Sequence, residues 1–138
     1  MATLQGKTAL VTGASRGIGR ATALALAEAG AHILVHYGRS TQDAESLVTD
    51  ILSKGGSGNA ISADLGTPEG ATLLAKEVRS IVGERLDVLV SNAGISKSAT
   101  FKDHTVADLT TSLRRMCAVR FSWCSNSCPS SVKAQTSL

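Results

Sequence analysis

The sequence feature that most constrains the fold is a glycine-rich segment, TGASRGIG, which runs from Thr12 to Gly19. It follows Lys7–Val11, a short apolar run typical of a buried strand, and leads into Ile18–Ala29, whose helix-forming composition stops at Gly30. Glycines at such a junction let the backbone turn tightly and approach a pyrophosphate, and the helix N-terminus then offers unpaired N–H groups. In this strand–helix context the segment predicts a dinucleotide site. The alternative is a glycine-rich turn that binds no ligand.

Strand-like and helix-like stretches alternate along the chain up to residue 108. Alternation with short connections predicts an α/β fold, a doubly wound parallel sheet with helices on both faces. The elements expected after the first strand and helix are a strand at His32–Tyr37, a helix at Thr41–Lys54 with Ser40 or Thr41 as N-cap, a weak strand at Asn59–Ala63, a helix from Thr67-Pro68-Glu69 to about Val82, a strand at Leu86–Val90 and a helix capped by Thr105.

Composition argues against several classes of protein. The chain is 43% apolar and can bury a core, yet no apolar run approaches the ~18 residues of a membrane span. The start, MATLQGKTALV, has no basic stretch ahead of an apolar one, so we expect no signal peptide and a cytoplasmic location. The net charge of +3 comes from residues 109–138, which hold four basic residues and no acidic one. A nucleic-acid partner needs a clustered basic face with aromatics and is not expected.

The cysteines are confined to the same C-terminal stretch, at Cys117, Cys124 and Cys128. Their spacing does not match the paired short spacings of zinc sites. An odd count without a secretion signal also argues against a disulfide framework. We therefore expect no metal site.

Three motifs in the predicted order resemble the short-chain dehydrogenase/reductase family. The pattern TGxxxGxG is joined by Asp64-Leu65 after the third strand, which is similar to the family's adenine-contacting position, and by Ser91–Gly94 after the fourth, which is similar to NNAG with Ser for the first Asn. The resemblance covers about residues 4–111 and implies a Rossmann-like sheet of strand order 3-2-1-4, a nicotinamide cofactor and, in an intact relative, a homo-oligomer. The cofactor-binding residues expected on this basis are Gly13, Ser15, Arg16, Gly17, Ile18, Gly19, Arg39, Ser40, Asp64, Leu65, Asn92, Ala93 and Gly94.

The end of the second strand favours NADP over NAD. NAD-binding proteins usually place an acidic residue about 20 residues after the glycine motif, to hold the ribose hydroxyls. Here the strand ends in Tyr37-Gly38-Arg39-Ser40, and the first acid is Asp43, in the expected helix. Arg39 can pair with a 2′-phosphate and Ser40 can donate a hydrogen bond to it, and by resemblance Arg16 is a second candidate. The alternative is that both arginines are merely solvated.

Two histidines lie on the second predicted strand, at His32 and His36. They fall on the same face of that strand because side chains alternate with a period of two. We interpret both as structural.

The family's catalytic residues are absent from the 138 residues. By resemblance, the chemistry needs a Tyr as general acid/base, a Lys four residues later and a Ser that holds the substrate oxygen. The only tyrosine is Tyr37, at the end of the second strand, with Thr41 four residues on. We therefore expect no catalytic residue here, a sheet truncated after about four strands, and a YxxxK motif beyond residue 138.

The composition of residues 112–138 indicates a shifted reading frame. Cys, Trp and Ser become common and acidic residues disappear. With permitted third bases, Ser112–Ser131 regroups in the neighbouring frame as FAATNVRSPFFLVQQLLPIV, which is similar to the family's segment after the fourth strand. The sequence therefore predicts a dinucleotide-binding half of a Rossmann domain at 1–111, a frame shift between about Leu109 and Ser112, and an aberrant, poorly ordered tail at 112–138. The alternative is a genuine short isoform with its own tail.

Together these features predict an NADP-dependent short-chain oxidoreductase by ancestry. An intact relative would pass hydride between NADP(H) and a small carbonyl or alcohol substrate. This chain alone is expected to be inactive. The alternatives are a non-catalytic dinucleotide-binding fragment and a truncated product with no function.

Overall fold

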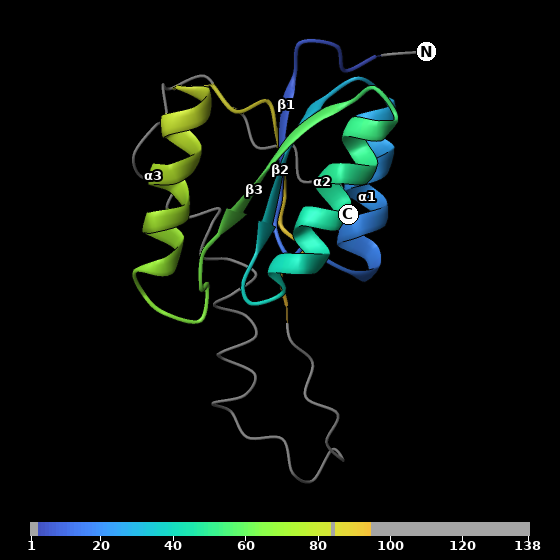
Figure 1. Ribbon diagram of the computed structural model, residues 1–138. Helices are drawn as coiled ribbons and strands as arrows, with labels where there is room; N and C mark the ends of the chain where they lie inside the picture. Colours follow the sequence, from blue (N-terminus) through green and yellow to red (C-terminus); the bar gives the residue numbers. More distant parts are fainter. Residues whose placement is uncertain (1–2, 84, 95–138) are drawn as a thin grey trace, which may run out of the picture.

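A computed structural model describes residues 3–83 and 85–94, in which strands and helices alternate (Figure 1). The four strands are parallel and lie in the order β3-β2-β1-β4. This confirms the predicted α/β, Rossmann-like sheet and its strand order. The elements are β1 (Thr8–Val11), α1 (Gly17–Glu28), β2 (His32–Tyr37), α2 (Thr41–Ser53), β3 (Ser57–Ser62), α3 (Gly70–Val82) and β4 (Val88–Val90).

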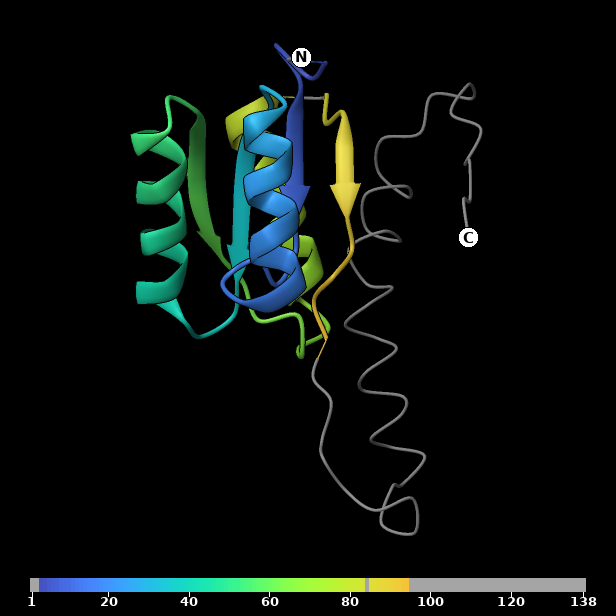
Figure 2. The same ribbon diagram turned by 90° about the vertical axis from the view of Figure 1, so that its right-hand side faces the viewer.

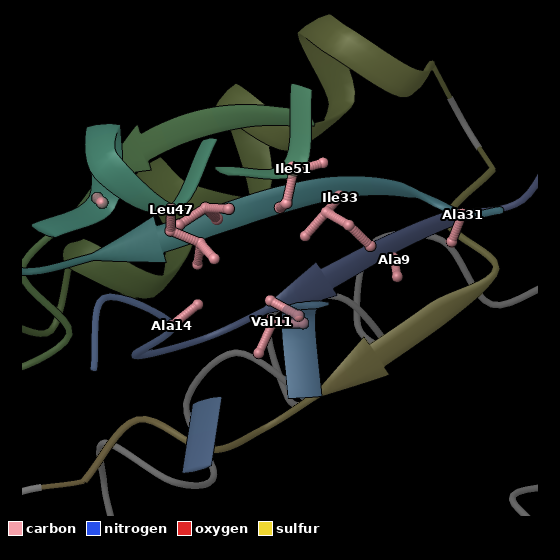
Figure 3. Packing of buried hydrophobic residues seen from close by; sticks show 10 residues of the cluster. Ala9, Val11, Ala14, Ala31, Ile33, Leu47 and Ile51 are labelled. Atoms are coloured by element: carbon pink, nitrogen blue, oxygen red, sulfur yellow. The ribbon is translucent and has the colours of Figure 1, made fainter. Parts of the chain in front are cut away.

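Helices cover both faces of the sheet, with α1 and α2 on one side and α3 on the other (Figures 1 and 2). Because side chains alternate along a strand, each inner strand serves two cores. Val11 and Ile33 pack towards α1 and α2, where Leu47 and Ile51 are buried (Figure 3). The opposite core, against α3, contains Leu10, Leu34, Ile61, Leu74 and Val78. The sheet is thereby covered on both faces, and its carboxyl edge is left to the connecting loops.

Most predicted boundaries agree with the structure, and β2 has the predicted limits. The third strand begins at Ser57 instead of Asn59, because the whole segment pairs in register with β2, from His32↔Ser57 to Tyr37↔Ser62. Tertiary pairing here overrides a sequence with weak strand preference.

The start of α3 was also predicted too early, at Pro68 rather than Gly70. The Thr67 hydroxyl does accept a hydrogen bond from the Gly70 N–H (3.1 Å), as expected of a capping residue. Residues 68 and 69 form a turn instead of helix. The chain also turns just before them, where the Asp64 carboxylate accepts the Gly66 N–H (2.8 Å).

No helix among the described residues is long and apolar enough to cross a membrane. The same part of the chain contains no cluster of three or more His, Cys, Asp or Glu side chains suited to a metal ion. The predicted helix at Thr105, the three cysteines and the proposed frame boundary lie outside the described residues.

Candidate functional site

The glycine turn after β1 depends on close approaches that only glycine permits. Gly13 has φ +63°, and a Cβ there would lie 2.8 Å from the Cα of Ala93. A Cβ on Gly19 would lie 2.5 Å from the Asn92 side-chain nitrogen. Gly17 differs: its φ is +57°, but a Cβ would meet no protein atom within 4 Å. Gly13 and Gly19 therefore let α1 and the β4 loop come together, whereas Gly17 leaves open space beside the loop.

The N-terminus of α1 offers free donors at this open space. The first N–H groups of a helix have no intrahelical acceptor. Arg16, at the N-cap, makes no side-chain capping bond, and the first turn contains no acidic residue. Neither the N-cap nor the first turn of α1 therefore compensates the partial positive charge of the helix end, an arrangement suited to a phosphate.

Thr12 joins β1 to the loop that follows β4. Its side chain is fully buried, and its hydroxyl accepts the backbone N–H groups of Asn92 and Ala93, both at 3.0 Å. In return, the Asn92 side-chain amide donates to the carbonyls of Thr12 and Gly13, both at 3.2 Å. Asn92 therefore fixes the glycine turn through hydrogen bonds, although its side chain is only half-buried.

The end of β2 brings two arginines and a serine to the same edge. A terminal nitrogen of Arg16 donates to the Ser40 hydroxyl (2.5 Å), and its Nε lies 3.2 Å from an Asp43 carboxylate oxygen. Arg39 is exposed, and its side chain makes no hydrogen bond or ion pair with any residue that the structure describes. Arg39 thus carries a positive charge that no carboxylate of the described residues pairs with.

These segments enclose a cleft of about 710 Å³ at the carboxyl edge of the sheet. This volume falls within the range of about 300–1,000 Å³ usual for small-molecule sites. A separate hollow between α1 and α2, of about 30 Å³, is too small for a cofactor. Among the described residues, the cleft is lined by Gly13, Ser15, Arg16, Gly17, Ile18, His36, Gly38, Arg39, Ser40, Ala63, Asp64, Leu65, Asn92, Ala93 and Gly94.

The structure brings all thirteen predicted site residues to this region, and twelve of them line the cleft. Gly19 does not line it and acts instead by allowing α1 to approach Asn92. Sequence reasoning missed three lining residues, His36, Gly38 and Ala63, and the anchor Thr12. Their positions could have indicated all four, because each lies at or next to the carboxyl end of a strand. The loop that follows each of these strands was already predicted to belong to the site.

His36 and Thr12 are the two buried polar residues in the described part of the chain. The interpretation of His36 as structural agrees with its burial, and its ring contacts two loops of the cleft. Its Nδ1 accepts the Gly13 N–H (3.1 Å), and its Nε2 lies 2.9 Å from the Ala63 carbonyl oxygen. Burial lowers the pKa of His36 below its ordinary value, opposed in part by the bond to Ala63.

A parallel sheet with a glycine turn and a cleft at its carboxyl edge defines the class of dinucleotide-binding α/β proteins. Comparison with known proteins identifies the family within that class. The family model "short chain dehydrogenase" matches residues 7–135, and the chain belongs to that family. The match extends into the segment that follows residue 111.

Among curated relatives, the chain is similar to Versicolorin reductase 1 of Aspergillus parasiticus, with 48% identity over 103 residues. This alignment covers 74% of the chain and 38% of the relative. It is also 50% identical over 91 residues to a 3-oxoacyl-[acyl-carrier-protein] reductase of Staphylococcus aureus, covering 66% of the chain and 37% of that relative. The chain thus spans well under half the length of these relatives.

Solved structures show the same relation. A short chain dehydrogenase from Burkholderia cenocepacia in complex with NADP superposes with a TM-score of 0.78 at 36% identity, covering 88% of this chain and 51% of that one. A 3-oxoacyl (acyl-carrier-protein) reductase from Agrobacterium tumefaciens with NADP bound gives 0.78 at 33% identity, covering 90% and 47%.

Proposed function

We propose that the cleft binds NADP(H), and that the chain derives from an oxidoreductase that exchanges hydride with a small carbonyl or alcohol substrate. The observation that carries this proposal is Arg39, exposed at the end of β2 with no ion-pair partner among the described residues. Arg16 and Ser40 lie beside it, and no acid stands where a ribose-binding carboxylate would be. The NADP-bound relatives support the same cofactor.

The residues of the cleft match the chemical groups of such a cofactor. The open space at Gly17 and the free donors of α1 suit a pyrophosphate. Asp64 and the buried Leu65 follow β3 and would flank the adenine, while Asn92–Gly94 would border the nicotinamide half. Bound nicotinamide would supply the hydride chemistry. Asp43 already pairs with Arg16, so Arg39 is the cation without a carboxylate partner among the described residues that line the cleft, and it would hold the 2′-phosphate.

Cofactor titration tests the proposal. NADPH should bind the full chain more tightly than NADH by about tenfold or more, because a charge-assisted hydrogen bond contributes ~1.5–3 kcal/mol. Arg39→Asp should reverse the preference. Lys76→Asp makes the same charge change on an exposed position of α3 outside the cleft and should leave it unaltered. Equal calorimetric affinities for the two cofactors in the unmodified chain would refute the proposal.

We further propose that residues 112–138 are read out of frame and that the 138-residue chain does not catalyse hydride transfer. The support is compositional: the segment contains no acid, and its shifted reading is similar to the family. The sole tyrosine, Tyr37, ends β2 and packs partly against the α1–α2 core, outside the residues that line the cleft. Loss of a proton donor alone typically costs 10²–10⁴ in rate.

The DNA sequence around codons 108–113 tests the frame shift. Restoring the frame should extend the family-like reading to a Ser and a YxxxK motif, whereas an early stop codon in the restored frame would contradict it. Measurable NADPH oxidation by the purified chain, with a panel of carbonyl compounds, would contradict the proposed inactivity. We also propose that the chain is located in the cytoplasm and that an intact relative forms a homo-oligomer.

The second candidate function is a non-catalytic dinucleotide-binding fragment. It is favoured by the sequence, which contains residues proposed to hold the cofactor, among them Gly13, Arg39 and Asn92, but no YxxxK motif. Binding of NADPH without turnover would support this candidate. Absence of both binding and turnover would indicate a product without function.

A further inference from the structure

One buried side chain joins two separate loops of the cleft. His36 lies near the carboxyl end of β2 with 2% of its surface exposed. Its ring reaches Gly13 in the β1–α1 loop through Nδ1 and Ala63, just after β3, through Nε2. Its backbone carbonyl also accepts the Ala14 N–H (2.9 Å). The loop expected to hold pyrophosphate and the loop expected to hold adenine therefore share a single imidazole.

The two bonds determine the protonation state of this imidazole. The Gly13 N–H can only donate, so Nδ1 must present a lone pair. The Ala63 carbonyl can only accept, so Nε2 must carry the hydrogen. Both bonds are satisfied only by the neutral Nε2–H form. In the imidazolium both nitrogens are donors, and the Gly13 N–H would then face another N–H at 3.1 Å.

We propose that His36 is a positioning residue that, in its neutral form, holds the two loops at the separation NADP(H) requires, and that protonation of its ring weakens cofactor binding. This inference rests on the proposed function, because it assigns a role within the same cleft. His36 acts through Gly13 and Ala63 and need not touch the cofactor's reacting atoms.

The charged groups around His36 do not oppose this assignment. Those that line the cleft are Arg16 from the β1–α1 loop, Arg39 from the β2–α2 turn and Asp64 from the β3–α3 turn. The β4 loop, 91–94, carries no charge. The residues of α3 buried against this face are also uncharged, namely Gly70, Ala71, Leu74, Ala75 and Val78.

The pKa of His36 is lowered chiefly by burial. The ring is therefore neutral above the ordinary value of about 6.5. The hydrogen bond to Gly13 is kept at neutral pH and lost as the pH falls through the lowered pKa.

The ring itself is tested first, by NMR on the full chain without cofactor. Nitrogen shifts should show Nδ1 unprotonated and Nε2 protonated at pH 8. The Gly13 amide resonance should move together with the His36 ring as it protonates. The opposite tautomer, or a Gly13 amide insensitive to that titration, would overturn the proposal even if NADPH binds.

Two substitutions then separate hydrogen bonding from space filling. His36→Asn keeps an acceptor near the Gly13 N–H but loses volume, whereas His36→Phe keeps the ring volume and loses both bonds. At pH 8 the Asn variant should bind NADPH within about threefold of the unmodified chain, and the Phe variant about 3- to 10-fold more weakly. A purely space-filling residue would give the reverse order, which would overturn the proposal. If the Phe variant does not fold, the Asn variant and its pH profile still decide.

The pH profile uses His32→Asn as the matched control. His32 lies on the same face of β2, but its ring bonds to Ser57 (2.9 Å) and does not line the cleft. The 2′-phosphate of NADPH is a phosphate monoester and also titrates near pH 6. The quantity to measure is therefore the Kd of the unmodified chain divided by the Kd of the variant at each pH, because titration of the phosphate affects both values alike. For His36→Asn this ratio should stay constant from pH 8 to 7 and rise several-fold as the pH falls through the pKa of His36 that the NMR titration gives. For His32→Asn it should stay flat.

A flat ratio for His36→Asn would overturn the pH dependence. Failure of the unmodified chain to bind NADPH at pH 8 would instead refute the proposed function, and the NMR measurement would still report on His36.

Discussion

Replacing Thr12 by Val should destabilise the protein through two backbone amides of the β4 loop. The substitution is nearly isosteric and removes the hydroxyl that accepts the N–H groups of Asn92 and Ala93 at 3.0 Å each. The hydroxyl also donates to the Val90 carbonyl at 3.3 Å. That carbonyl keeps a hydrogen bond in the variant, because it still accepts the backbone N–H of residue 12 at 3.0 Å. The cost therefore comes from two unpaired donors.

An unpaired buried donor costs ~1–3 kcal/mol, and the lower end applies here because Asn92 and Ala93 are only half-buried. We expect a loss of about 2 kcal/mol in the free energy of unfolding. The control, Thr12→Ser, keeps the hydroxyl and removes one methyl group, at a cost of ~0.8 kcal/mol.

Urea denaturation should place the midpoint of Thr12→Val below that of Thr12→Ser, with the same slope for both. NADPH binding should weaken in Thr12→Val, since the loop loses its backbone anchors beside the cleft. A Val variant as stable as the Ser variant would show that the hydroxyl contributes nothing beyond its volume, and would refute the reasoning.

Gly19→Ala should cost about 1–3 kcal/mol in the free energy of unfolding, because its Cβ would lie 2.5 Å from the Gly13 carbonyl oxygen. The control is Gly38→Ala, whose Cβ would meet no atom within 4 Å at a φ that is not positive, and it should change that free energy by no more than about 0.5 kcal/mol. Urea denaturation measures both variants. The Asp87 carboxylate accepts the Thr8 N–H (3.0 Å) and pairs with Lys7 and Arg85, and these contacts lower its pKa, the bond to Thr8 most. Its contribution is therefore present above the ordinary carboxyl pKa and lost as the pH falls through the lowered value. Asp87→Asn should lose stability at pH 7 and converge with the unmodified chain in strong acid; an equal difference at both pH values would contradict this.

The sequence predicted the class of fold, the strand order and the loops of the site because these depend on local periodicity and on glycine. It gave the limits of β2 well, since HILVHY has strong strand preference. It placed β3 and α3 less accurately, because the start of β3 is determined by pairing with β2 and the start of α3 by the turn that Asp64 caps.

The role of His36 lay beyond the sequence for a different reason. A period of two places a side chain on one face of a strand but does not name the backbone groups it meets there. Gly13 and Ala63 are 23 and 27 residues away, and only the folded chain shows that one ring bonds to both.

The position of β1 between β2 and β4 also bears on the order in which the protein assembles. His32 and Ser57 are bonded across a separation of 25 residues, whereas Thr8 reaches Asp87 across 79. Closing a longer loop costs more chain entropy, and distant pairings slow folding. The unit from β1 to β3 should therefore form first and β4 should dock onto it afterwards. On this order the contacts of Thr12 with Asn92 and Ala93 form when β4 docks, and not before.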